Sequence, residues 1–221
     1  MPFTPHHGIQ AAKPADYPQL IEVLIKAFDA DPHIAWLIRR DEKRAIAYRQ
    51  FFTMMLNGLA QPHGEIYTTD SLNSVALWYP PGRGKIGFLK QAKVAPAFIG
   101  AVGWNSLFSR MVGIEKMEYH HPREPHYYLQ LLGVDPAHQG TGGGRALLKP
   151  MLHQCDALQT CAYLETANPN NVGYYEGFGF QVVHSMQMPD KGPKLWMMKR
   201  PPRPVGSALS GVATSCASMA V

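Results

Sequence analysis

The sequence contains few of the features that mark secreted, membrane-spanning or disulfide-bonded proteins. Its three cysteines, Cys155, Cys161 and Cys216, are an odd number without Cys-x-x-Cys spacing, so we expect free thiols in a reducing compartment. The uncharged run 94–109 is too short to cross a bilayer. Residues 1–7 contain neither a charged leader nor an apolar signal core. These absences predict a cytoplasmic protein without a membrane segment.

Charged residues are also scarce, and they carry a small basic excess. Only 17% of the residues are charged, 46% are hydrophobic, and the formal net charge is +5, as in a soluble globular protein. The excess suits a polyphosphate ligand. No Lys- or Arg-rich run with interleaved aromatic residues is present, so we expect no nucleic-acid partner. His120, His121 and His126 lack a second cluster of ligands, so we expect no metal site.

The length of the chain bounds its domain count. With 221 residues, it suits a single domain with a substantial core. We assign residues 1–202 to that domain. The small, almost uncharged residues 203–221 are expected to form a disordered tail.

A glycine-rich segment is the most informative stretch of the sequence. The apolar run 127–134 ends at Asp135-Pro136 and predicts a buried strand. Four glycines follow between Gly140 and Gly144, and Ala146-Leu147-Leu148 opens a helical pattern. The first turn of a helix has unpaired N–H groups and a partial positive charge, and glycines let a phosphate approach them. This order therefore predicts an anion-binding site.

The spacing of the glycines narrows the choice of phosphate ligand. A Walker loop requires a lysine directly after its last glycine, and the dinucleotide fingerprint requires glycine where Arg145 stands. The pattern Gln139-x-x-Gly142-x-Gly144, after Val134-x-Pro136, resembles instead the coenzyme A pyrophosphate loop of the GNAT N-acetyltransferases. An ordinary glycine-rich turn is the alternative interpretation.

The rest of the chain alternates between helical and extended patterns. Helices are predicted over 17–29 and, with Asp41 as N-cap, over 41–59, and a mostly helical stretch, interrupted at Pro96 and Gly100, over 86–111. That last stretch could form an apolar wall over a substrate or serve packing alone. Further expected elements are strands 8–12, 64–69 and 75–79, a helix at 142–158, a strand at 162–166, a helix at 172–178, and an antiparallel pair, 181–188 with 195–199.

Several blocks of the second half extend the resemblance to the GNAT superfamily, and within it to puromycin N-acetyltransferase-like proteins. They are 121–125 (His-Pro-Arg-Glu-Pro), 132–140 (Leu-Gly-Val-Asp-Pro-Ala-His-Gln-Gly), 163–166 (Tyr-Leu-Glu-Thr), 174–180 (Tyr-Tyr-Glu-Gly-Phe-Gly-Phe) and 195–201 (Leu-Trp-Met-Met-Lys-Arg-Pro). Residues 1–120 match only in the order of elements.

The resemblance implies an α/β (α+β) GNAT fold. This is a mixed, mostly antiparallel sheet of six or seven strands with helices on both faces. Its central strands, 127–134 and 162–166, would splay apart to admit the pantetheine arm of acetyl-CoA. Gly133 would ease a bulge there, and Pro136 would stop further pairing.

The resemblance also implies the cofactor, acetyl-CoA, and the residues that hold it. Main-chain amides around 132–134 would face the thioester carbonyl. Asn168 and Asn171 would bond the pantetheine amides, although turn formation explains them nearly as well. The full expected set is Leu132, Gly133, Val134, Gln139, Gly140, Thr141, Gly142, Gly143, Gly144, Arg145, Asn168, Asn171 and Tyr175.

Two side chains are expected to move protons. By resemblance, Tyr175 would protonate the departing thiolate, and Glu165 would remove a proton from the amine, directly or through water. A core tyrosine and a strand-end carboxylate are the plain structural alternatives. His121, Glu124 and Tyr128 are expected on the acceptor side.

We therefore expect an acyltransferase that acetylates the primary amine of a small molecule by direct attack in a ternary complex, as antibiotic-resistance enzymes of this kind do. Acetylation of a peptide or protein amine is a second possibility. A non-catalytic acyl-CoA-binding module is a third. The chain would act as a monomer or a homodimer.

Overall fold

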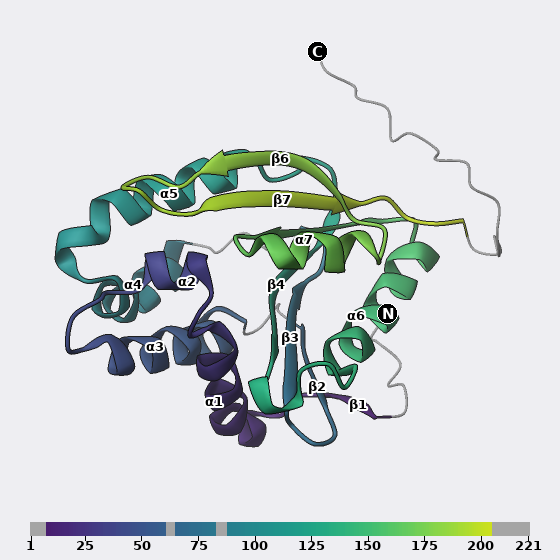
Figure 1. Cartoon of the computed structure of the whole chain (residues 1–221), viewed down its shortest axis with the longest axis horizontal. Coiled ribbons are helices and arrows are strands. Elements are labelled where there is room, and N and C mark those ends of the chain that lie inside the picture. Colours follow the sequence, from purple (N-terminus) through teal and green to yellow (C-terminus); the bar gives the residue numbers. More distant parts are fainter. Residues whose placement is uncertain (1–7, 61–64, 83–87, 205–221) are drawn as a thin grey trace, which may run out of the picture.

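A seven-stranded sheet forms the centre of the protein (Figure 1). The computed structural model describes residues 8–60, 65–82 and 88–204, so the predicted tail lies outside the described residues from 205 onward. The strands are β1 (Ile9–Ala11), β2 (Glu65–Thr69), β3 (Ser74–Tyr79), β4 (His126–Val134), β5 (Cys161–Thr166), β6 (Gln181–Gln187) and β7 (Lys194–Arg200). Their order is β1-β2-β3-β4-β5-β7-β6, and only the β4–β5 pair is parallel. The predicted mixed, mostly antiparallel sheet is confirmed.

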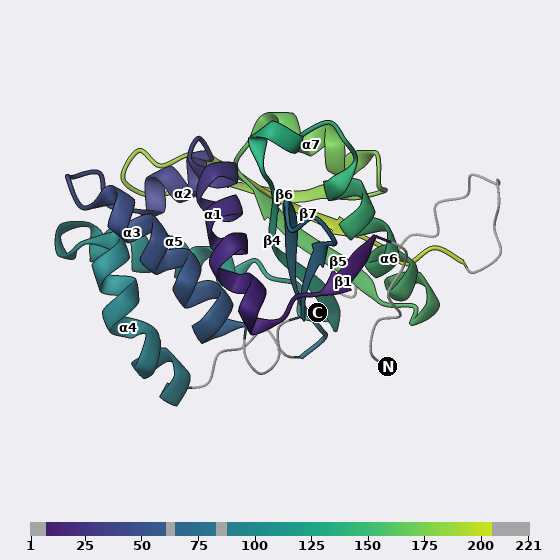
Figure 2. The ribbon, with the colours of Figure 1, turned by 90° about the horizontal axis from the view of Figure 1, so that it is seen from below.

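Helices cover both faces of this sheet, as predicted. One face carries α1 (Tyr17–Phe28), α2 (Pro32–Leu37), α3 (Arg44–Thr53), α4 (Phe88–Val102) and α5 (Leu107–Tyr119). The other carries α6 (Gly143–Ala157) and α7 (Pro169–Glu176) (Figure 2). Short helical turns complete the list: η1 (Pro14–Asp16), η2 (Met54–Leu59), η3 (Trp104–Ser106) and η4 (Pro136–His138).

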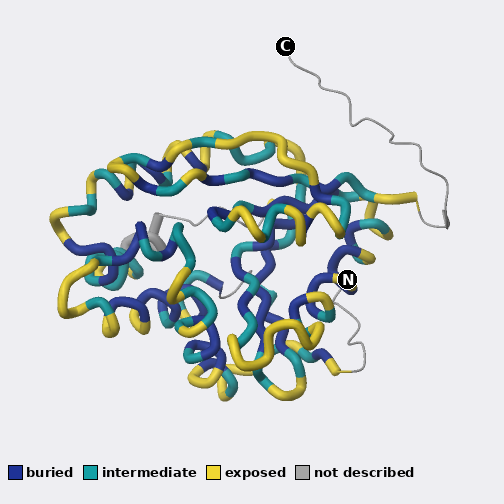
Figure 3. The backbone as a smooth tube through the Cα atoms, viewed as in Figure 1, coloured by how far each residue is buried: buried dark blue, intermediate teal, exposed yellow. Residues whose placement is uncertain are grey.

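Each face of the sheet has its own hydrophobic core. Because neighbouring strand residues point to opposite faces, Leu77 and Tyr163 pack beneath α1–α5. Trp78 and Leu164 pack beneath α6 and α7. The buried residues follow the central strands and the inward sides of the helices (Figure 3). The sheet therefore separates two differently built halves of the molecule.

The two central strands, β4 and β5, are paired at one end and separate partway along their length. β4 pairs with β5 only over His126–Leu129 and Cys161–Leu164. Beyond that point β4 pairs with β3 alone, and β5 pairs with β7 alone. This is the splay that the resemblance implied, and it leaves the inner edge of each strand facing a gap.

The bulge in β4 lies at a different residue from the one expected. The β3–β4 register shifts between Leu77 and Trp78, which pair with Leu131 and Leu129, so Gln130 is the extra residue. Gly133 has another role, since a Cβ atom there would lie 2.9 Å from the side chain of Leu24 on α1. The glycine therefore lets α1 pack closely against the sheet.

The helical half departs most from the predicted elements. Asp31 accepts hydrogen bonds from the amides of His33 and Ile34 and caps α2, a helix that was not predicted. Asp41 is not the cap of α3, which begins at Arg44. The predicted stretch 86–111 divides at Gly103, whose φ is +82°, and continues to residue 119 as α5. No helix among the described residues is long and apolar enough to cross a membrane.

Candidate functional site

The glycine loop presents main-chain amides to solvent at the start of α6. Gly140 and Gly142 have φ values of +79° and +94°, a backbone conformation that favours glycine. Residues 139–142 are exposed. Within the described chain, the amides of residues 142–145 bond to no carbonyl, as expected for a first helical turn. The loop thus supplies the unpaired donors that an anion requires.

The next two glycines are needed for close packing. A Cβ atom on Gly143 would lie 2.3 Å from the hydroxyl of Ser74, the first residue of β3. A Cβ atom on Gly144 would lie 3.1 Å from the hydroxyl of Tyr174 on α7. Because these positions lack side chains, the start of α6 can lie close to β3 and to α7.

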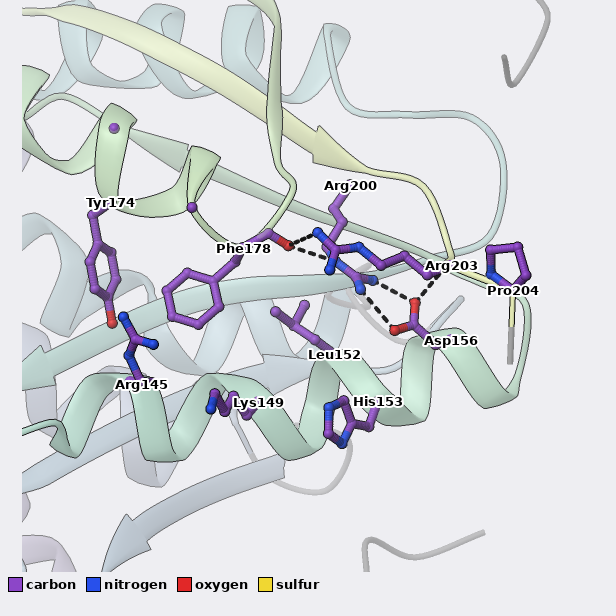
Figure 4. Close-up of a pocket in the computed structure, with 12 residues that line it drawn as sticks. Arg145, Lys149, Leu152, His153, Asp156, Tyr174, Phe178, Arg200, Arg203 and Pro204 are labelled. Carbon is purple, nitrogen blue, oxygen red and sulfur yellow. Dashed lines mark hydrogen bonds and ion pairs between the residues drawn. The ribbon is translucent and has the colours of Figure 1, made fainter. Parts of the chain in front are cut away.

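A basic groove continues from this loop between α6 and α7 (Figure 4). Its volume is about 710 Å³. Arg145 and Lys149 project into it from α6, and the Arg145 guanidinium lies 5.6 Å from the ring centre of Phe178. At the far end Arg200 pairs with Asp156 at 2.7 Å. The groove therefore combines cations with aromatic surface next to the exposed amides.

Glu165 lies on the other face, where β4 and β5 separate. β5 pairs with β4 only as far as Leu164, so Glu165 is the first β5 residue beside the gap. It points to the α1–α5 face, as Tyr163 does two residues earlier. Its side chain is 5% exposed, and its Oε1 lies 2.9 Å from Nε2 of His121.

Polar atoms around Glu165 are buried without a well-directed hydrogen bond. In the described part of the chain this holds for Glu165 Oε1, His121 Nε2 and the Tyr163 hydroxyl, although the first two form an ion pair by distance. Buried polar atoms normally have partners. This cluster is therefore suited to bonding a polar group that comes into the gap.

Burial and the Glu165 charge set the protonation of this cluster. Burial lowers the pKa of His121, but the Glu165 carboxylate more than offsets it and raises the pKa overall. Burial, and then Glu165, raise the pKa of Tyr128 and Tyr163. Burial lowers the pKa of His33, against nearby carboxylates that include Glu165. One carboxylate is thus surrounded by tyrosines that keep their protons and by imidazoles from two segments.

Tyr175 lies on the opposite face of the sheet, in the core beneath α6 and α7. It lies near the end of α7, is 8% exposed, and packs against Phe180 in the α6/α7 core. Burial raises the pKa of its hydroxyl, so the hydroxyl keeps its proton at neutral pH. Among the described residues no hydrogen bond joins it to Glu165.

Other predicted site residues are used in local structure. The Asn168 side chain caps α7 by accepting from the amide of Asn170, and the Asn171 amide donates to the Asn168 carbonyl. Glu124 forms an ion pair with Lys199 on β7, which lowers the pKa of its carboxyl. The structure thus brings His121 and Tyr128 to Glu165 but does not bring Glu124 there.

Sequence reasoning missed three neighbours of the site: His33, Tyr163 and Tyr174. His33 comes from α2, a helix that was not predicted. The Asp31-Pro32 pair could have revealed this helix, because aspartate at the N-cap followed by proline is a helix-start pattern. Tyr174 appeared only as part of the 174–180 block, and its hydroxyl would lie 3.1 Å from a Cβ atom on Gly144.

Comparison with known proteins identifies the family and the fold. The sequence model of the family described as Acetyltransferase (GNAT) family matches residues 52–180. A structure described as histone acetyltransferase HPA2 and related acetyltransferase, from Corynebacterium glutamicum, is similar with a TM-score of 0.70 and 24% identity. The match covers 90% of this chain and 98% of that one.

Two further solved structures share the fold. The ribosomal-protein-S18-alanine N-acetyltransferase from Escherichia coli has a TM-score of 0.52 and 14% identity, with 92% of this chain and 98% of that one covered. Mosquito arylalkylamine N-acetyltransferase like 5b has a TM-score of 0.51 and 14% identity, with 87% and 98% covered. The closer resemblance to puromycin N-acetyltransferase-like proteins remains a prediction.

Proposed function

Because this chain belongs to the GNAT acetyltransferase family, we propose that it moves an acetyl group from acetyl-CoA to the primary amine of a small molecule. The observation that carries the proposal is the buried Glu165 cluster. It lies where the central strands separate, and three of its buried polar atoms, Glu165 Oε1, His121 Nε2 and the Tyr163 hydroxyl, lack a well-directed hydrogen bond among the described residues. A buried carboxylate at such a place can bond an amine and accept its proton.

The residues on the α6/α7 face fit coenzyme A. In this proposal the amides of residues 140–145 hold the pyrophosphate, and Gln139 and Thr141 flank it. Arg145 and the aromatic wall of the groove receive the nucleotide end. Bound acetyl-CoA supplies a thioester, an acyl donor with a good leaving group. Asn168 and Asn171 retain their proposed contact with the pantetheine arm.

The splay provides main-chain donors for the reacting carbonyl. Past Leu129, β4 bonds to β3 on one side only, so alternate amides of its last residues face the gap. Donors at Leu132, Gly133 or Val134 would stabilise the developing oxyanion, and a preorganised donor of this type is worth about 3 kcal/mol.

The two proton carriers lie on opposite faces of the sheet. Glu165, held by His121, takes the proton of the attacking amine on the α1–α5 face. Tyr175 is protonated before the reaction, and it donates this proton to the departing thiolate on the α6/α7 face. The amine can therefore lose its proton to Glu165 while the thiolate receives one from Tyr175. Direct attack in a ternary complex requires both groups to be in position together.

The burial of the acceptor side supports a small amine. The side chains of Glu165 and His121 are only 5% and 16% exposed, and Tyr128 is buried beside them. A peptide N-terminus remains the second candidate, since one similar structure is named for acetylating a protein.

A product-based screen tests the proposal. We expect free CoA to be released when the protein is mixed with acetyl-CoA and a panel of amines, aminonucleosides and peptides, with N-acetylated products identified by mass spectrometry. Binding of acetyl-CoA without release for any amine would indicate a binding module. Release with peptides alone would replace the small-molecule assignment.

A further inference from the structure

His33 is a polar side chain that the proposed mechanism does not use. It is the second residue of α2, and its backbone amide donates to the Asp31 cap. Its ring nitrogen Nε2 is buried and has no hydrogen-bond partner in the described part of the chain. The Glu165 carboxylate lies close enough to act on its charge. Because buried polar atoms are normally paired, this nitrogen is available to a group that enters beside Glu165.

The imidazole ring is held in place by Trp36, three residues further along α2. The two rings stack, with their centres 5.9 Å apart and an angle of 22° between their planes. Trp36 is 2% exposed, and its Nε1 donates a hydrogen bond to the carbonyl of Pro189 at 3.0 Å. The Arg110 guanidinium of α5 lies 4.4 Å from the indole ring centre and 3.0 Å from the Asp190 carboxylate. The indole is therefore fixed by two other segments, and it fixes the orientation of the His33 ring in turn.

Two glycines show how closely the protein packs around this indole. A Cβ atom on Gly113 of α5 would lie 2.6 Å from the Trp36 ring. A Cβ atom on Gly192, in the turn between β6 and β7, would lie 2.6 Å from Nε1 of the same indole. Because α2 is fitted this tightly, loose packing does not explain the unpaired nitrogen of His33, and a role in binding does.

The protonation state of His33 limits what it can bind. Burial lowers its pKa, against the nearby carboxylates, so the ring is neutral at neutral pH. A neutral imidazole nitrogen either donates or accepts a hydrogen bond, depending on the tautomer. A hydroxyl group does both, so it can pair with either tautomer. An ammonium group would instead go to the Glu165 carboxylate.

We propose that His33 determines the acceptor specificity of the site, because its Nε2 bonds a hydroxyl group that the acceptor carries next to its primary amine. The inference rests on the proposed function, in which Glu165 receives the amine. Aromatic rings surround this place, since the rings of Tyr128 and Tyr163 each lie 4.7 Å from the ring of His121. The acceptor class that fits both features is an aromatic amino alcohol.

Two amines that differ by one hydroxyl group test this assignment: phenethylamine and its β-hydroxy derivative. With saturating acetyl-CoA, we expect the wild type to prefer the hydroxylated amine about 10-fold or more in kcat/KM. His33→Leu keeps a side chain of similar size without a polar atom, and it should abolish this preference by raising KM for the hydroxylated amine. An equal loss with both amines would make His33 a structural residue and overturn the proposal.

Matched variants separate hydrogen bonding from packing. His33→Gln places an amide nitrogen near the position of Nε2 and should restore part of the preference. His184→Leu makes the leucine substitution at an exposed residue of β6, and it should keep the wild-type ratio. Circular dichroism melting curves that match the wild type would show that the variants are folded. A preference lost in His184→Leu as well would contradict the assignment to His33.

The outcomes for the proposed function and for His33 are distinct. Equal kcat/KM for the two amines would keep the function and overturn the role of His33. If only peptides are acetylated, dipeptides that begin with serine and with alanine differ by the same hydroxyl group and replace the pair. A readout without turnover is the imidazole NMR signal of His33, identified by its loss in His33→Gln. It should shift with the hydroxylated compound of the pair more than with the other, and equal shifts, or none, would overturn the proposal.

Discussion

On the α6/α7 face the candidate site is built mainly from main chain, whereas on the α1–α5 face it is built from side chains. The first uses exposed amides and glycines at the start of α6. The second uses a buried carboxylate with imidazole and phenol neighbours drawn from four segments. Main-chain amides fit a ligand that does not vary, such as coenzyme A. Side chains on the α1–α5 face can be changed one residue at a time to suit a particular acceptor. Substitutions should therefore separate the two faces.

The largest effect is expected from Glu165→Gln, which keeps size and polarity but removes the base. We expect kcat at saturating acetyl-CoA to fall about 10²–10⁴-fold, the usual range for a positioned general base. The affinity for acetyl-CoA should change little, because Glu165 lies on the face away from α6. Steady-state kinetics with an accepted amine measures both quantities.

The exposed Glu176 on α7 offers the control. Glu176→Gln should have wild-type kcat. If Glu165→Gln also retained wild-type turnover, Glu165 would be a structural carboxylate and the side-chain account of the α1–α5 face would fail.

A smaller effect is expected from Tyr175→Phe. A thiol of pKa near 8.5 leaves with little help, so we expect kcat to fall only about 10- to 100-fold, at or below the lower end for acid–base catalysis. The loss should be greater with a poorer leaving group, for which an acyl oxyester analogue of acetyl-CoA serves. An equal loss with thioester and oxyester would assign Tyr175 to packing.

Gly143→Ala tests the α6/α7 face, where the candidate site is built from main-chain amides. The new Cβ atom would lie 2.3 Å from the buried Ser74 hydroxyl, and overpacking of this kind costs about 1–3 kcal/mol in the free energy of unfolding. We expect a lower Tm and a higher KM for acetyl-CoA, with kcat at saturation nearly unchanged. The double variant Ser74→Ala/Gly143→Ala should recover part of both losses. No recovery would mean that the loop is disturbed by something other than this contact.

The same division explains what the sequence could predict. The loop at 139–145 and the strand before it follow from local rules, since glycine, proline and the first turn of a helix each restrict the backbone in a known way. The splay itself came from family resemblance. The Glu165 neighbourhood depends on tertiary packing, and no local pattern indicates that His33 and Tyr163 lie beside that carboxylate. Glu124 shows that closeness in sequence is no better guide. It lies three residues from His121 in the chain, but its side chain forms an ion pair with Lys199 on β7 instead of joining the Glu165 cluster.

The smallest effect concerns the pH dependence of stability. The pKa of His121 is raised in the folded protein relative to about 6.5 in the unfolded chain. The stabilisation from this group is therefore fully present below the unfolded pKa and is lost as the pH rises through the folded pKa. We expect His121→Gln to lower Tm by about 2–4 °C for each kcal/mol lost, more at pH 6 than at pH 9. His153→Gln, at an exposed residue of α6 without a carboxylate partner among the described residues, should show no such difference. A gap between wild type and His121→Gln that widened towards pH 9 would contradict the pairing, because a neutral imidazole gains nothing from the Glu165 charge.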